Sequence, residues 1–265
     1  LGMGFGLVEA SRFRRKGYKS IHGVWATMPA TAAYVISRLA GAEFSMGAHA
    51  YDVFRLGGDW LLSIKLEKAK FVRTSSRSTA RRLTALGLSH DKCRLVRRSL
   101  EQRPMRKKFE PTNPGRVSML SVGRLVEKKG YFHQLGIARE LHLKGIPFEL
   151  NVIGSGVLLP ELILESKRIG VNGKVRFLGS LPLREVWEHY MRNDLFVFTG
   201  VIDSRGDRDG IPNVVLEALA AGMLVLSSDQ AGASEPVVDG VNGFSLSPFN
   251  PNLWVDKVIE FWKDP

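Results

Sequence analysis

The sequence has 265 residues, 44% of them hydrophobic, so it can bury one large core or two moderate ones, and intrinsic disorder is not expected. Its net charge of +12 is unevenly placed: residues 1–110 hold 22 Lys and Arg against 8 Asp and Glu, whereas the remainder holds 16 against 18. This asymmetry predicts that the first part meets an anionic membrane surface or substrate, unless it is a solvated basic face without a partner. Nucleic acid is disfavoured as a partner, because the basic stretch 97–108 lacks interleaved aromatic residues.

The chain contains no apolar run of the length that crosses a membrane. The best candidate, 211–226, is interrupted by Glu217. The single cysteine, Cys93, forms no intrachain disulfide and no cysteine-based metal cluster, which favours a reducing compartment and a cytoplasmic protein. The chain opens at Leu1 without a signal peptide, so we expect a partial sequence.

Short apolar runs alternate with helical periods through most of the chain, the pattern of parallel sheets wound by helices. In the first part we expect strands at 20–26, 43–48, 71–74 and 94–96, and helices at 30–39 and 78–86. A charged stretch with three prolines, 97–114, is the expected linker. After it we expect strands at 117–122, 148–153, 175–177, 195–198 and 224–227, and helices at 131–143, 158–169, 183–191, 213–221 and 253–262.

The segment from Asp209 to Glu217 follows one of these strands and carries the most informative residues. Pro212 occupies the expected first position of a helix, and Gly210 before it lets a ligand approach the backbone. The free N–H groups of that helix end suit a diphosphate, and the Glu217 carboxylate suits the two hydroxyls of a ribose. The alternative is that Glu217 is a surface acid of the helix, but its apolar neighbours favour a ligand or a cationic partner.

A second polar segment, 121–130, follows the strand at 117–122. Arg124 and Lys129 lie on either side of a tight turn that opens a helix, so both can reach one anionic site and clamp a diphosphate. The alternative is a solvated basic turn. Two further segments also follow strands: the glycine pair around Ser155, too short for a dinucleotide fingerprint, and His49, which is either catalytic or structural. The glycines of residues 2–6 have no preceding strand, so we assign them no role.

Taken together and in order, these segments resemble the retaining glycosyltransferases of the fourth family, which have the GT-B fold. The best match is to bacterial exopolysaccharide and colanic-acid enzymes. The matching segments are 123–125 with 129–130, 152–156, 209–217, 240–243 and 49–52. The resemblance implies two Rossmann-like parallel-sheet domains facing a cleft: a partial N-terminal acceptor domain, 1–108, and a C-terminal donor domain, 109–265. It also implies that the N-terminal domain is truncated and lacks its first strand and the glycine-rich loop that follows.

The resemblance implies a role for each matched residue. Arg124 and Lys129 would hold the donor diphosphate, Glu217 the ribose and Asp209 the sugar, with His49 near the anomeric centre. The remaining donor-site residues implied by the match are Gly123, Gly154, Leu181, Gly210, Ile211, Pro212, Asn213 and Val214. Asp209 departs from the family's usual glutamate, and Thr199-Gly200 replaces its usual Pro-Ser.

The implied activity is metal-independent transfer of a hexose, with retention, from a nucleotide-diphosphate sugar to a lipid-linked or polysaccharide acceptor, without a cofactor. The first part would contact anionic lipid at the cytoplasmic face of the inner membrane. The alternatives are a nucleotide-sugar-binding module without catalysis, a GT-B epimerase acting on UDP-sugars, and a peripheral membrane or nucleic-acid binder.

Overall fold

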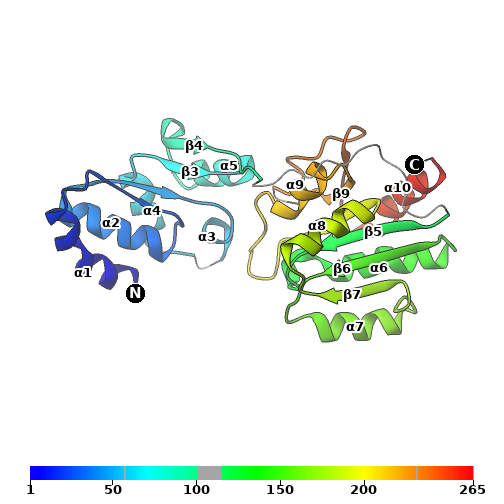
Figure 1. Ribbon diagram of the computed structural model, residues 1–265. Helices are drawn as coiled ribbons and strands as arrows, with labels where there is room; N and C mark the ends of the chain where they lie inside the picture. Colours follow the sequence, from blue (N-terminus) through cyan, green and yellow to red (C-terminus); the bar gives the residue numbers. More distant parts are fainter. Residues whose placement is uncertain (57, 101–114, 231, 265) are drawn as a thin grey trace. The chain divides into compact units, whose positions relative to one another are not determined.

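A computed structural model describes residues 1–56, 58–100, 115–230 and 232–264, and its chain divides into two compact units (Figure 1). The first unit comprises Leu1–Ser99 together with Ser204–Gly210. The second comprises Leu100–Asp203 and Ile211–Pro265. The segment Ser204–Gly210 therefore interrupts the sequence of the second unit but packs with the first unit. We call it the detour segment.

The first unit is a four-stranded parallel sheet in the order β1-β2-β3-β4. Its strands are β1 (Ser20–Gly23), β2 (Glu43–Gly47), β3 (Val72–Thr74) and β4 (Cys93–Leu95). Its helices are α1 (Gly2–Arg15), α2 (Met28–Ala40), α3 (Tyr51–Phe54), α4 (Leu62–Lys68) and α5 (Arg77–Ala85). Its core is built from alanines of α2 and the apolar residues of β2, β3 and α5, among them Phe44, Met46, Val72 and Leu83.

Helix α1 was not expected from the sequence, and the glycines at its start have a structural role. Cβ atoms added at Gly2 and Gly6 would overlap Met28 and Val35 of α2, whereas one at Gly4 would meet nothing. Two small residues four positions apart thus let α1 lie close against α2, and the expectation that these glycines have no role is corrected. Strand β1 also ends at Gly23, three residues earlier than expected, because the start of α2 packs directly onto Gly23.

The second unit is a six-stranded parallel sheet in the order β10-β9-β8-β5-β6-β7. Its strands are β5 (Val117–Val122), β6 (Phe148–Ile153), β7 (Val175–Gly179), β8 (Leu195–Phe198), β9 (Leu224–Ser228) and β10 (Gly243–Leu246). Its helices are α6 (Tyr131–Leu143), α7 (Leu159–Arg168), α8 (Leu183–Arg192), α9 (Asn213–Ala220) and α10 (Pro251–Lys263). α6, α7 and α10 pack into one core cluster with the sheet, and α8 and α9 into another.

The strand order of the second unit changes direction at β5. The chain runs from β5 through β6 to β7 on one side, and then returns to place β8 on the other side of β5. The crevice beyond the carboxyl ends of the strands at such a reversal is the usual ligand site of an open α/β sheet. In this unit, the loops after β5 and β8 flank that point.

Candidate functional site

The turn after β5 brings Lys129 to the point where the strand order reverses. Its Nζ lies 5.1 Å from the centroid of the Phe198 ring at the end of β8. Its stem passes Gly123, where an added Cβ would lie 3.7 Å from Lys129 Cε. Arg124, on the same turn, is exposed and makes no hydrogen bond or ion pair with any residue that the structure describes. Two cations therefore flank the position where an anionic ligand of this fold is expected.

Glycines allow the loops at this edge of the sheet to touch through their backbones. A Cβ at Gly154, whose φ is +137°, would overlap the carbonyl oxygen of Gly123, and one at Gly156 would overlap Leu125. The backbone N–H of Leu125 donates to Ser155 O at 2.9 Å. Gly154 and Gly156 therefore hold the β5 and β6 loops together, a structural role that the glycine pattern alone does not reveal.

The Thr199-Gly200 pair, which departs from the family pattern, fits closely against the same turn. A Cβ at Gly130 would overlap Thr199 O, and the Thr199 hydroxyl donates to Gly130 O at 2.8 Å. The backbone N–H of Val201 donates to Lys128 O at 2.9 Å. The loop after β8 thus fixes the conformation of the turn that carries Lys129.

Glu217 lies on α9, and the residue that holds it is a tyrosine rather than a cation. The hydroxyl of Tyr190, a fully buried residue of α8, donates to Glu217 Oε2 at 2.8 Å. Burial and the nearby carboxylate raise the pKa of Tyr190 well above its usual value, so this hydroxyl stays a donor at any physiological pH. Within the described chain, the Oε1 atom of Glu217 accepts no hydrogen bond, which leaves one carboxylate oxygen for a ligand.

The other residues expected at the donor site lie at a helix cap, against a core cluster and in a loop. Pro212 caps α9 rather than starting it, because its ψ of 129° is extended and the helix begins at Asn213. Val214 and Leu181 pack, half-buried, against the core cluster of α8 and α9. The loop that contains Leu181 is joined to the β6 loop by a hydrogen bond between Ser180 and Ser155 hydroxyls of 2.9 Å.

The structure places His49 and the Asp209-Gly210 pair in the first unit. An added Cβ at Gly210 would lie 3.5 Å from His49 O, so the detour segment reaches the loop after β2. The Asp52 carboxylate accepts the N–H groups of His49 and Ala50 at 3.0 and 2.9 Å, which orders that loop. The resemblance had placed His49 and Asp209 at the same sugar, and the structure brings the backbones of residues 49 and 210 close together.

The His49 imidazole is buried and packs edge-on against Trp25, with ring centroids 5.0 Å apart. Burial lowers the pKa of His49; Arg98 and Arg73 lower it further, whereas Asp52 and a hydrogen bond with the Val24 backbone raise it. His49 is therefore a neutral imidazole near pH 7. Its Nδ1 atom is buried without a hydrogen-bond partner among the described residues, a state that a bound ligand would relieve.

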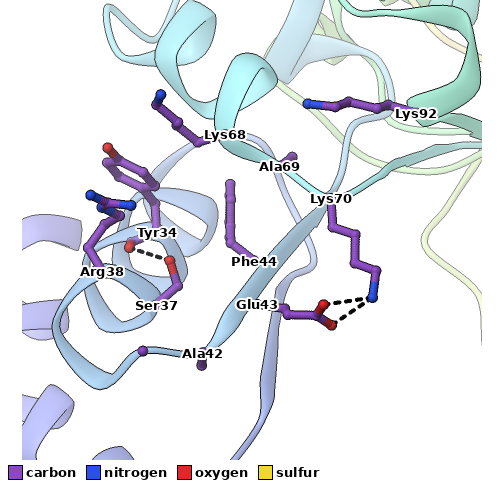
Figure 2. Close-up of a pocket in the computed structure, with 11 residues that line it drawn as sticks. Tyr34, Ser37, Arg38, Ala42, Glu43, Phe44, Lys68, Ala69, Lys70 and Lys92 are labelled. Carbon is purple, nitrogen blue, oxygen red and sulfur yellow. Dashed lines mark hydrogen bonds and ion pairs between the residues drawn. The ribbon is translucent and has the colours of Figure 1, made fainter.

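A basic groove of about 680 Å³ lies at the opposite edge of the same sheet, where the strands begin. Figure 2 shows Arg38, Lys68, Lys70 and Lys92 around it, with Lys70 paired to Glu43 at 2.8 Å. None of the expected site residues lines this groove. In the described ranges, no cluster of three or more His, Cys, Asp or Glu side chains suits a metal ion, and no helix has the length and apolar character to cross a membrane.

The chain has two parallel α/β sheets, and in the second sheet cations lie where the strand order reverses. These features are those of the GT-B class of α/β proteins. Anabaena HepE in complex with UDP superimposes with a TM-score of 0.75 and 15% identity, over 96% of this chain and 72% of that one. The chain belongs to the family Glycosyl transferases group 1, whose profile matches residues 102–265. The expected GT-B fold and the expected membership of a glycosyltransferase family are thereby confirmed.

Two curated relatives show how much of a whole protein the chain covers. The amylovoran biosynthesis glycosyltransferase AmsK of Erwinia amylovora is 30% identical over 173 residues, 65% of this chain and 42% of AmsK. A Campylobacter jejuni relative named as an N-acetylgalactosamine-N,N'-diacetylbacillosaminyl-diphospho-undecaprenol 4-alpha-N-acetylgalactosaminyltransferase is 28% identical over 196 residues, 73% of this chain and 51% of that protein. The chain thus spans about half the length of these relatives, or less.

Proposed function

We propose that the protein transfers a hexose from a nucleotide-diphosphate sugar to a lipid-linked or polysaccharide acceptor in exopolysaccharide synthesis, with retention of the anomeric configuration. The observation that carries the proposal is the pair Arg124 and Lys129 at the reversal point of the second sheet. The UDP bound to HepE and the diphospho-undecaprenol in the name of the Campylobacter relative support the two substrate classes.

The chemistry of the departing diphosphate follows from these residues. Cleaving the bond between sugar and diphosphate leaves negative charge on the phosphate oxygens. The Arg124 guanidinium and the Lys129 ammonium stabilise that charge, and the positive end of the α9 helix dipole adds to them. Because the negative charge on these oxygens grows as the bond breaks, the cations lower the energy of the transition state more than that of the bound donor.

The two acids and the histidine have separate tasks in this proposal. The Oε2 atom of Glu217 accepts a hydrogen bond from Tyr190, which fixes the carboxylate, and the Oε1 atom accepts hydrogen bonds from the hydroxyls of the ribose. Asp209 binds the transferred sugar. His49, held neutral by burial, uses its buried Nδ1 to hydrogen-bond a substrate group beside the anomeric carbon. A neutral imidazole orients a hydroxyl there without adding positive charge next to a cationic transition state.

The test begins with a screen of UDP-, GDP- and ADP-sugars for binding and turnover. With the active donor, Arg124→Ala and Lys129→Ala should each lower kcat/KM by about 100-fold or more, whereas Lys144→Ala, an exposed lysine beyond α6, should not. Wild-type turnover in either site variant would refute the proposal that Arg124 and Lys129 hold the donor diphosphate. Donor binding without turnover would instead indicate a binding module, and a product formed from the donor alone an epimerase.

We further propose that the basic first unit brings the protein to the cytoplasmic face of an anionic membrane, where a lipid-linked acceptor resides. Each Lys or Arg near such a surface adds about 1 kcal/mol of attraction. Cosedimentation with vesicles containing phosphatidylglycerol should therefore exceed that with neutral vesicles and decline as salt rises. Equal sedimentation with both kinds of vesicle at moderate salt would refute the proposal.

A further inference from the structure

The detour segment contacts the rest of the first unit near both of its ends. Near its start, the backbone N–H of Leu56 donates to Arg205 O at 2.8 Å. Gly206 has a φ of +75°, a left-handed conformation that favours glycine, and a Cβ added there would lie 3.2 Å from both Phe54 O and Leu56 Cγ. The segment therefore turns closely against the end of α3, where glycine fits without strain.

The end of the detour segment reaches the loop after β2. A Cβ added at Gly210 would lie 3.5 Å from His49 O. Between the two ends, the Arg208 guanidinium lies over the Phe54 ring of α3, 4.6 Å from its centroid, and Arg208 Nε donates to Gly206 O at 3.4 Å. A guanidinium at this distance over an aromatic ring makes a favourable cation–π contact. The segment is thus held along most of its length.

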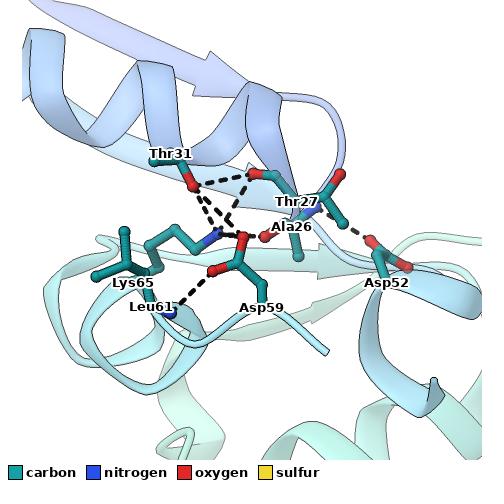
Figure 3. Close-up of polar contacts among 7 residues, drawn as sticks. All are labelled: Ala26, Thr27, Thr31, Asp52, Asp59, Leu61 and Lys65. Carbon is teal, nitrogen blue, oxygen red and sulfur yellow. Dashed lines mark hydrogen bonds and ion pairs between the residues drawn. The ribbon is translucent and has the colours of Figure 1, made fainter. Parts of the chain in front are cut away.

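The surface that holds the detour segment is itself fixed by buried hydrogen bonds. The Asp52 carboxylate, 3% exposed, accepts the N–H groups of His49, Ala50 and Ala26. Figure 3 shows the bond from Ala26, whose carbonyl oxygen in turn accepts from the ammonium of the fully buried Lys65. The loop after β2 and the start of α3 are therefore ordered, and they offer the segment a preformed surface.

Asp209 lies between two of the contacts, those of Arg208 and Gly210, so its backbone is held by the first unit on both sides. Glu217 follows only eight positions later but belongs to the second unit. The two acids assigned to the donor are thus carried by different units. The contacts with α3 and with the loop after β2 fix the position of Asp209.

We propose that Arg208 and Phe54 are positioning residues for Asp209. Their contact sets where the Asp209 carboxylate stands relative to His49, and thereby which hydroxyl of the transferred sugar it binds. This inference rests on the proposed glycosyl transfer and deepens it: residues of the first unit select the stereochemistry of the sugar, whereas residues of the second unit hold the nucleotide. A carboxylate on a fixed backbone accepts from a hydroxyl in one orientation, and an epimer loses that hydrogen bond.

The test compares two donors that share a nucleotide and differ in one sugar hydroxyl, such as UDP-glucose and UDP-galactose or GDP-glucose and GDP-mannose. Phe54→Leu removes the ring and keeps apolar bulk. It should lower kcat/KM of the preferred donor about 10-fold and the ratio of the two kcat/KM values about 5-fold. Phe54→Tyr keeps the ring and should retain the wild-type ratio. Tyr18→Leu is the matched control, because Lys16 Nζ lies 5.9 Å from the Tyr18 ring centroid elsewhere in the first unit, and it should also retain the ratio.

Arg208→Met removes the same contact from its other side and should reduce the ratio to the same extent. The double variant with Phe54→Leu should lose no more than either single variant, because all three lack one and the same contact. The affinity for UDP or GDP alone, measured by calorimetry, should be the same in every variant, since these ligands carry no sugar for Asp209 to bind. A loss of nucleotide affinity parallel to the loss of kcat/KM would indicate general disruption and overturn the proposal.

The outcomes separate this proposal from the proposed function. A wild type that turns over a nucleotide sugar, with an unchanged donor ratio in Phe54→Leu and Arg208→Met, would overturn the positioning role and leave glycosyl transfer standing. Additive losses in the double variant would also overturn it, since the two residues would then act separately. A wild type that uses no nucleotide sugar would overturn both proposals.

Discussion

Replacing Lys65 by methionine tests whether the buried ion pair between Lys65 and Asp59 stabilises the first unit. Methionine fills much of the same space but removes the Lys65 donor from Asp59 Oδ2 and from the Ala26 carbonyl, while Asp59 Oδ1 keeps its hydrogen bond from the Leu61 N–H. Removing one partner of a buried ion pair costs about 3–5 kcal/mol. Asp59 keeps 14% of its side chain exposed, so water can reach it and the lower end of that range, about 3 kcal/mol, is expected.

The first unit contains about 100 residues, so a loss of about 3 kcal/mol should lower its melting temperature by about 12 °C or more. Differential scanning calorimetry measures this shift. Lys70→Met is the matched control: Lys70 contacts Glu43 at the same 2.8 Å, but these side chains are 60% and 59% exposed. The control should change stability by less than about 1 kcal/mol. Equal effects of the two substitutions would refute the reasoning from burial.

Three other changes probe the site. Tyr190→Phe should weaken donor binding about 3–10-fold and lower the unfolding free energy by about 1–2 kcal/mol, measured by calorimetry; unchanged binding would mean that Glu217 is positioned without Tyr190. Gly154→Ala should lower the unfolding free energy by about 2 kcal/mol or more, whereas Gly173→Ala, with open space around it, should not; similar denaturation midpoints would contradict the loop contact. The pKa of His49 in the folded protein lies below 6.5, so the unfolded chain binds more protons than the folded protein as the pH falls below 6.5. The free energy of unfolding should therefore decrease as the pH decreases through this range. If His49→Gln shows the same pH dependence as the wild type, His49 does not cause it.

Local signals in the sequence were sufficient for much of the second unit. The helix at 131–143 and the strand at 148–153 have the expected bounds, because apolar periodicity, a preceding glycine and a following turn all agree there. Helix α1 was missed because three glycines in its first five residues oppose a helix locally. Contacts of Gly2 and Gly6 with α2 outweigh that preference, and only the folded unit contains them.

The candidate site was predictable where residues follow strands, and not where distant residues meet. Arg124, Lys129 and His49 could be proposed from their positions after strands. Tyr190 reaches Glu217 across 27 positions of sequence, and Lys65 reaches Ala26 across 39. A buried lysine looks like any surface lysine in a sequence, because its burial depends on which loops close over it.

The detour of Ser204–Gly210 has a consequence for how the protein can be divided. Its contacts lie in the first unit: Leu56 N–H donates to Arg205 O at 2.8 Å, and the Arg208 guanidinium lies 4.6 Å from the Phe54 ring centroid. The polypeptide therefore passes between the units three times, at residues 99–100, 203–204 and 210–211. A single proteolytic cut between residues 99 and 115 leaves the units covalently connected at residues 203–204 and 210–211. A fragment that starts at residue 115 still contains Ser204–Gly210, which belongs to the first unit.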